Sequence, residues 1–142
     1  MLAKKELPEQ DWRAAFDTLL MLGNVDLFYY PGLIYSDTSL YDYAVTKVRR
    51  RLYHIKSELD EHSKVNPVLD MMLETCTNFQ ATLYTARNPD PQSDEIELSE
   101  SELSKLSTQF LNKMSGPITW LVETYELHPP NQYLTELMVR PA

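Results

Sequence analysis

Three residues of metal-ligating type occur at four-residue intervals in the middle of the chain: His54, Glu58 and His62. On one helix this spacing aligns them along a single face, where imidazole and carboxylate groups can bind zinc or iron. The pattern differs from the H-E-x-x-H motif of metalloproteases. Each step of four residues also rotates the side-chain direction by about 40° around the helix axis. A metal-binding protein is therefore an alternative hypothesis only, and we expect no metal site and no cofactor.

The same region is rich in positive charge. The segment TKVRRRLYHIK, residues 46–56, holds five of the 13 lysines and arginines. Helical geometry places Lys47, Arg50 and His54 on one face, with Arg51 beside it. This face either pairs with the chain's own acids or contacts an anion or an acidic segment of a partner through Lys47, Arg50 and Arg51. Nucleic acid is not expected, because regularly spaced stacking residues are missing.

Residue types suited to nucleophilic catalysis are few. Cys76 falls among the apolar positions of a predicted helix, which is typical of a buried and inert thiol. His128 has no partner that its spacing identifies, and three glycines form no phosphate-binding loop. The residues favour a non-catalytic function, and an enzyme whose active site is assembled by the fold stays an alternative.

Aromatic residues are concentrated in DLFYYPGLIYSDTSLYDY, residues 26–43. One interpretation is a segment that folds back over the end of the helices as a hydrophobic lid. The other is a partner-binding surface, because tyrosine is enriched among the residues that dominate binding energy at interfaces. The predicted contact residues are Asp26, Phe28, Tyr29, Tyr30 and Tyr35.

The six residues DLFYYP, Asp26 to Pro31, resemble the DLIYYP-type segment of colicin-type nuclease immunity proteins. Proteins of that family are small, acidic and helical, and they bind a basic nuclease through the corresponding aspartate and two tyrosines. The resemblance implies that Asp26, Tyr29 and Tyr30 contact a basic nuclease or another nucleic-acid-binding protein. This chain is longer and has one predicted helix before the segment, where that family has two. An immunity-type inhibitor is accordingly a further alternative.

Composition and charge limit the class of protein. The 142 residues are 43% hydrophobic and 24% charged, as in ordinary globular proteins, and their number suits one domain over residues 1–142. A net charge of −8 argues against a general binder of nucleic-acid phosphates. The N-terminus lacks the apolar run of a signal peptide, and LLML falls far short of the roughly 20 residues that span a membrane. With a single cysteine, the chain is expected in the cytoplasm, away from membranes.

Apolar residues recur at helical spacing through most of the chain. The first predicted helix runs from Pro8 to Gly23 with these apolar residues facing inward: Trp12, Ala15, Phe16, Leu19 and Leu20. The second begins at residues 37–39 and continues to about Ser63, and the third runs from Asn66 to just before Pro89. Between the first two helices lies an aromatic-rich loop, residues 23–38, whose length is typical of functional loops.

Residues 88–98 are predicted to be an acidic internal linker, and a capping box of Ser99 and Glu102 then starts another helix. Pro117 either kinks that helix or opens a separate one, and the preceding Ser115 and Gly116 favour the separate helix slightly. A short amphipathic segment closes the chain, with its apolar residues at Tyr133, Leu134, Leu137 and Met138.

These patterns predict an all-α bundle of four to five helices. We expect an acidic, cytoplasmic binding or regulatory module that acts through a protein partner. The net charge of −8 suits a basic partner, and a homo-oligomer is compatible with the sequence. The alternatives are a helical-bundle enzyme or metal-binding protein, and the immunity-type inhibitor.

Overall fold

A computed structural model describes residues 7–29, 38–87 and 99–138, and all regular secondary structure in these ranges is α-helical. The four long helices are α1 (Leu7–Gly23), α3 (Thr38–Ser57), α4 (Asn66–Arg87) and α5 (Glu100–Thr124). The two short helices are α2 (Asp26–Tyr29) and α6 (Gln132–Met138). The predicted all-α bundle is confirmed.

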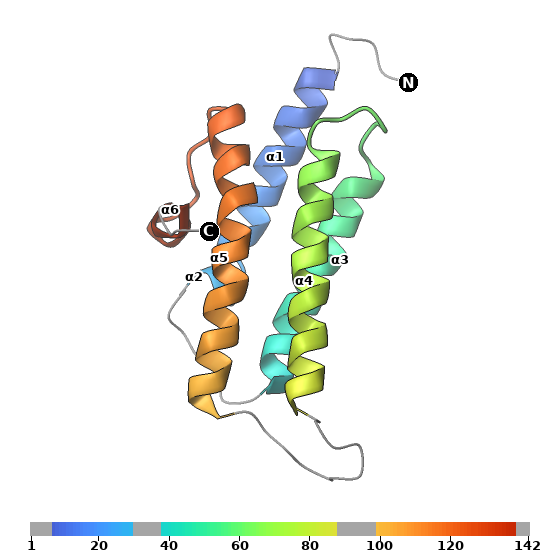
Figure 1. Ribbon diagram of the computed structural model, residues 1–142. Coiled ribbons are helices and arrows are strands. Elements are labelled where there is room, and N and C mark those ends of the chain that lie inside the picture. The colour runs from blue at the N-terminus through green and yellow to red at the C-terminus, as the bar shows by residue number, and fades with distance from the viewer. Residues whose placement is uncertain (1–6, 30–37, 88–98, 139–142) are drawn as a thin grey trace.

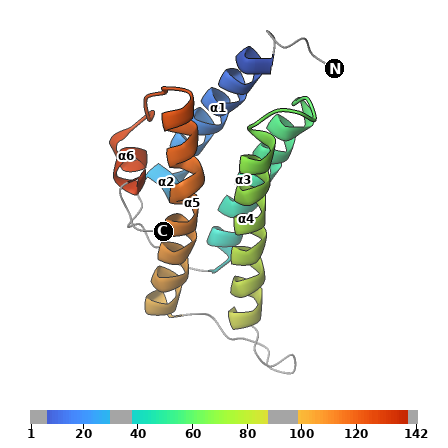
Figure 2. The same ribbon diagram turned by 45° about the horizontal axis from the view of Figure 1, so that its top comes forward.

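The four long helices run along one another, with α4 and α5 at the front and α1 and α3 behind them (Figures 1 and 2). The seam predicted for the second helix is the buried face of α3, which contributes Tyr41, Val45, Val48, Leu52 and Ile55 to a hydrophobic cluster shared with the other helices. In the described part of the chain, no helix is both long enough and apolar enough to cross a membrane.

A chain of four aromatic rings crosses the core. Tyr41 of α3 meets Phe79 of α4 edge to face, with ring centres 6.2 Å apart. Phe79 stacks on Phe110 of α5 at 4.8 Å, and Phe110 contacts Phe28 of α2 at 5.9 Å. Such pairs add about 0.5–1.5 kcal/mol to the stabilisation from buried area. The rings therefore connect α3, α4 and α5 to α2.

The buried face of α1 differs from the prediction. Ala15 and Leu19 are buried as expected, but the side chains of Trp12, Phe16 and Leu20 are 44%, 43% and 46% exposed. The physical reason is that α1 carries apolar residues on two adjacent stripes, and only one of them can face α3 and α5. The inward stripe includes two polar members, Asp11 and Thr18.

The predicted end of the second helix near Ser63 is wrong, because α3 ends at Ser57. The Ser57 hydroxyl donates a hydrogen bond to the carbonyl oxygen of His54 at 2.6 Å, and a side chain that binds the backbone in this way competes with helix continuation. The turn that follows is held by α1, since the amide of Gln10 donates to the carbonyl of Glu58 and accepts from the backbone N–H of Asp60.

α5 is one continuous helix with Pro117 inside it, so the slight preference for two separate helices is wrong. Proline removes one backbone hydrogen bond from the helix. Met114, Ile118 and Leu121 lie on both sides of that point and are all fully buried, so their packing maintains a single helical axis. The predicted cap is confirmed: the backbone N–H of Glu102 donates to Ser99 Oγ at 3.2 Å.

α6 is the predicted C-terminal amphipathic segment, and it buries Leu134 and Leu137. Asn131 fixes its start, because its Oδ1 accepts the backbone N–H of Leu134 while its Nδ2 donates to the carbonyl of Gly23 at the end of α1. The segment predicted as a loop, residues 23–38, contains α2. The predicted acidic linker, residues 88–98, lies outside the described residues.

The two described glycines differ in the space around them. Gly116 in α5 is exposed, and a Cβ there would meet no atom within 4 Å apart from its chain neighbours, one of which is Pro117. A proline ring disfavours the helical conformation of a preceding residue that carries a Cβ, which opposes the gain in helix propensity, so Gly116→Ala should change the free energy of unfolding by less than about 1 kcal/mol. A Cβ at Gly23 would lie 2.5 Å from Cγ of Pro130, so Gly23→Ala should lower the free energy of unfolding by more. Urea denaturation of both variants measures this difference, and equal losses would contradict the close approach of Pro130 to Gly23.

Candidate functional site

The aromatic segment is only partly a surface. Phe28 is fully buried against Phe110, which favours the hydrophobic-lid interpretation for this residue and removes its ring from any contact surface in this structure. Asp26 and Tyr29 are the first and last residues of α2. Tyr30 and Tyr35 lie outside the described residues, so their predicted contact role stays a prediction.

The predicted metal-ligating residues do not share a helix. Because α3 ends at Ser57, Glu58 and His62 lie in the following turn. His54 Nε2 is 3.6 Å from a Glu58 carboxylate oxygen, while His62 pairs instead with Glu61 at 3.4 Å. Within residues 7–29, 38–87 and 99–138, no three histidine, cysteine or acidic side chains are grouped to hold a metal ion. The structure therefore does not bring these three residues together.

The basic residues of α3 form an exposed face, which we call the cationic face and define as Lys47, Arg50 and Arg51. All three side chains are exposed. None of them forms an ion pair with an acid within 4.0 Å in the part of the chain that the structure describes. The geometry therefore does not favour the interpretation that these cations pair with the chain's own acids.

Nearby polar residues of α3 are engaged elsewhere. Asp42, the acid closest in sequence, accepts a 2.8 Å hydrogen bond from Gln80 of α4. Gln80 also accepts a 2.8 Å hydrogen bond from Arg49, which distinguishes this arginine from the two that follow it. Asp42 and Arg49 therefore help hold α3 to α4, and the cationic face points away from that contact.

Two exposed tyrosines of α3 lie close to the cationic face. Lys47 Nζ is 5.4 Å from the ring centre of Tyr43, a cation–π distance that orients the ammonium group along the helix surface. Tyr53 is also exposed, on the turn after Arg50. Tyrosine supplies stiff contact area with a polar tip, so it suits a protein-binding surface beside charged groups. Sequence periodicity identified the cations but did not select these two rings.

A cleft of about 260 Å³ lies between α1 and α3, beside the cationic face. Ala14 and Ile55 contribute apolar surface to it, and Arg51 and His54 reach it from α3. The remaining lining side chains are Gln10, Arg13, Asp17, Glu58 and Leu59. The structure thus brings Arg51 of the cationic face together with His54 and Glu58, two of the three residues considered as metal ligands. Arg13 and Asp17 were not predicted, because nothing in the sequence shows that α1 lies against this part of α3.

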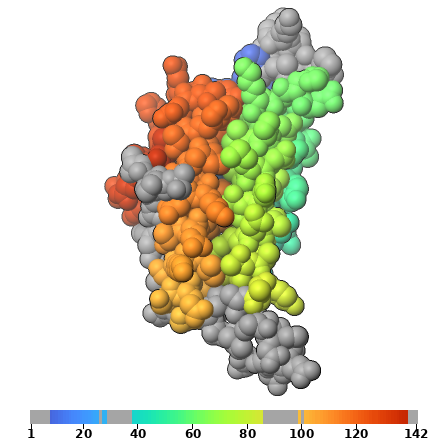
Figure 3. Space-filling view, viewed as in Figure 1, coloured from blue at the N-terminus to red at the C-terminus, as the bar shows by residue number. Residues whose placement is uncertain are grey.

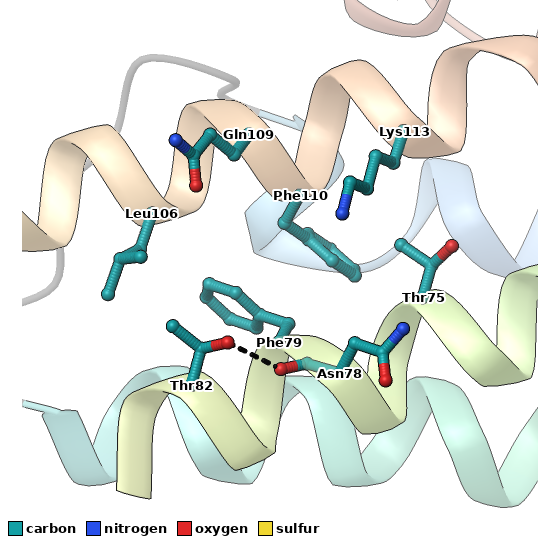
Figure 4. A pocket seen from close by; sticks show the side chains of 8 residues that line it. All are labelled: Thr75, Asn78, Phe79, Thr82, Leu106, Gln109, Phe110 and Lys113. Carbon is teal, nitrogen blue, oxygen red and sulfur yellow. Dashed lines mark hydrogen bonds between the residues drawn. The ribbon is translucent and has the colours of Figure 1, made fainter. Parts of the chain in front are cut away.

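The groove between α4 and α5 is much smaller. These helices meet along the face shown in Figure 3, and the groove has a volume of about 50 Å³. Figure 4 shows the Phe79 and Phe110 rings between the helices, with Lys113 and Gln109 projecting from α5. Ligand pockets usually have volumes of about 300–1,000 Å³, so this groove is too small for a substrate.

Cys76 is fully buried in α4. Burial raises the pKa of its thiol to about 12, although the positive charge of Arg49 acts in the opposite direction. A thiol with this pKa remains protonated near neutral pH and is a poor nucleophile. Its position matches the inert core residue that the sequence predicts.

Comparison with models of known protein families, with curated proteins and with solved structures finds no match for this chain.

Proposed function

We propose that this chain is a non-catalytic helical binding module that recognises an acidic segment of a protein partner through Lys47, Arg50 and Arg51. The observation that carries the proposal is the absence of ion pairs at these three exposed cations in the described residues. Acids outnumber lysines and arginines by 21 to 13 in this chain, so internal partners are plentiful. A cationic face that forms no ion pair with the described acids is suited to acids supplied by another molecule.

The surroundings of the cationic face favour a protein segment. Tyr43 and Tyr53 offer contact area to side chains of a partner, and the apolar surface of the neighbouring cleft at Ala14 and Ile55 can accept a small apolar side chain next to an acid. Polynucleotides are disfavoured because the net charge of −8 repels a long polyanion. A short acidic segment interacts mainly with the positive charges close to it.

A charge-reversal experiment tests the proposal. A short fluorescein-labelled oligoglutamate peptide serves as the probe, and its binding is followed by fluorescence anisotropy at low and high salt. We expect the double variant Arg50→Glu/Arg51→Glu to bind at least about tenfold more weakly than the wild type, a change of about 1.4 kcal/mol. Its stability should be nearly unchanged, because exposed charges contribute only about 0–1 kcal/mol each.

The matched control is Lys64→Glu. Lys64 is exposed in the turn between α3 and α4, makes no ion pair among the described residues, and lies outside the cationic face. Lys64→Glu changes the net charge by the same amount as Arg50→Glu alone. Equal weakening by these two single variants would mean that only net charge matters, and the proposal would fail. Tighter binding of single-stranded DNA than of oligoglutamate, with the same dependence on Arg50 and Arg51, would assign the face to nucleic acid instead.

A further inference from the structure

The exposed apolar stripe of α1, which we define as Trp12, Phe16 and Leu20, is separate from the cationic face and is not used by the proposed function. We infer that it is the interface of a homodimer in which the α1 helices of two copies pack antiparallel. The inference goes beyond the proposed function and does not depend on it.

The stripe is continuous along the helix. Its residues follow one another at intervals of four, which places neighbouring side chains in contact on one side of α1. The rings of Trp12 and Phe16 are stacked, with centres 5.3 Å apart and planes within 9° of parallel. Isolated exposed hydrophobic residues are normal on protein surfaces, but three adjacent large side chains on one helix face form the kind of surface that packs against another helix.

Charges beside the stripe complement a second copy of the same helix. Arg13 and Asp17 are exposed and lie on the same flank of the stripe. In an antiparallel pair related by a two-fold axis near Phe16, equivalent flanks face each other, and Arg13 of one copy lies within about 3 Å, measured along the helix axis, of the level of Asp17 in the other. Two such pairs form by symmetry. Within one copy, neither residue forms an ion pair in the described part of the chain.

The size of the stripe indicates a weak dimer. From the exposed fractions of its three side chains, it offers roughly 250–300 Å² of surface per copy, against about 800 Å² per partner in a typical stable interface. Flanking residues enlarge the contact but are polar. We therefore expect a dissociation constant in the micromolar range, so that the chain is monomeric when dilute and dimeric when concentrated.

Sedimentation velocity over about 5 to 500 µM brackets this range and measures the dissociation constant directly. The wild-type chain is expected to shift from monomer to dimer. Leu20→Glu should remove the dimer over the whole range, because each copy then places a carboxylate against the apolar stripe of the other. The matched control is Met71→Glu, which makes the same change at a 54% exposed position of α4 and should leave dimerisation unchanged.

Charge reversal tests the antiparallel arrangement. Arg13→Asp places aspartates opposite aspartates, and Asp17→Arg places arginines opposite arginines, so each single variant should dimerise at least about tenfold more weakly than the wild type. An equimolar mixture of the two variants restores opposite charges at both contacts. We expect the mixture to form a heterodimer with an affinity close to that of the wild-type dimer.

Circular dichroism confirms that each variant is folded before its assembly is interpreted. A wild-type chain that stays monomeric at the highest concentration would overturn the inference and leave the stripe to a different partner. A dimer that survives Leu20→Glu would also overturn it, because its interface would lie elsewhere. Failure of the charge-reversed mixture to recover would reject the antiparallel pairing.

Discussion

Phe110→Ala is expected to lower the free energy of unfolding by about 3–5 kcal/mol, the range found for large aromatic residues deleted from protein cores. Phe110 is 2% exposed and lies in the middle of the ring chain, in contact with both Phe79 and Phe28. Its truncation therefore removes contacts of α5 with α4 and with α2 at once. In a chain of this length the melting temperature should fall by about 10 °C or more.

Two further variants make this result specific. Phe110→Leu keeps most of the volume and should cost less than about 1.5 kcal/mol, which provides a measurable variant if Phe110→Ala does not fold. Phe16→Ala deletes the same ring from a 43% exposed position of α1, and in dilute solution it should cost much less than Phe110→Ala. Equal losses for Phe16→Ala and Phe110→Ala in thermal denaturation would contradict the assignment of core and surface.

The helices best predicted from the sequence are those with a single apolar stripe. The seam of α3 from Tyr41 to Ile55 has one such stripe, and its burial follows directly from helical periodicity. The starts of α4 at Asn66 and of α5 after Ser99 were also predicted. At α5 the predicted cap acts within one helical turn, whereas the Asn66 side chain donates to the carbonyl of Asp60. Local signals of this kind do not require knowledge of the tertiary structure.

The predictions of burial and helix boundaries were wrong where contacts with distant segments of the chain determine the structure. In α1 both stripes are apolar, and the choice between them depends on which face meets α3 and α5. The buried position of Asp11 could not be expected from its charge, because its hydrogen-bond partner Ser63 is 52 residues away in the sequence. Pro117 favoured a helix boundary because the sequence shows that proline removes a backbone hydrogen bond. The sequence does not show the packing of Ile118 and Leu121, which keeps the helix continuous.

In the candidate site, too, the features set within one helix were predicted and those set by contacts between helices were not. Periodicity placed Lys47 and Arg50 on one face, since both lie on one helix. Whether those charges were paired depended on α4, because Gln80 engages the nearby Asp42 from another helix. The cleft beside Arg51 likewise depends on how α1 lies against α3, which no pattern within either helix specifies.

Asp11 gives the second large expected effect. Its buried carboxyl group accepts a 2.5 Å hydrogen bond from Ser63 Oγ, which itself accepts a hydrogen bond from the backbone N–H of Val65. These bonds attach α1 to the turn that leads into α4. Because a hydrogen bond to a charged group contributes about 1.5–3 kcal/mol, Asp11→Ala should lower the free energy of unfolding by about that amount.

A double-mutant cycle measures the hydrogen bond itself. The variants Asp11→Ala, Ser63→Ala and their combination are compared by urea denaturation, and residues in direct contact should show a coupling energy of about 0.5–3 kcal/mol. Asp11→Asn is the matched control, since it retains an oxygen acceptor for Ser63 and should lose less stability than Asp11→Ala. Losses that simply add would show that Asp11 and Ser63 stabilise the chain independently.

Tyr125, at the end of α5, supplies an independent optical test of where Asp11 lies. Burial, followed by the negative charge of Asp11, raises the pKa of the Tyr125 phenol from 10.0 to about 12. Between these two values the folded chain binds more protons than the unfolded chain, so the contribution of Tyr125 to stability is present below pH 10 and is lost as the pH rises toward 12. Removing the charge with Asp11→Ala should lower the pKa of Tyr125, and this tyrosine should ionise at lower pH in an alkaline absorbance titration. An unchanged titration curve would mean that the charge of Asp11 does not act on Tyr125, and that α1 does not approach the end of α5 as described.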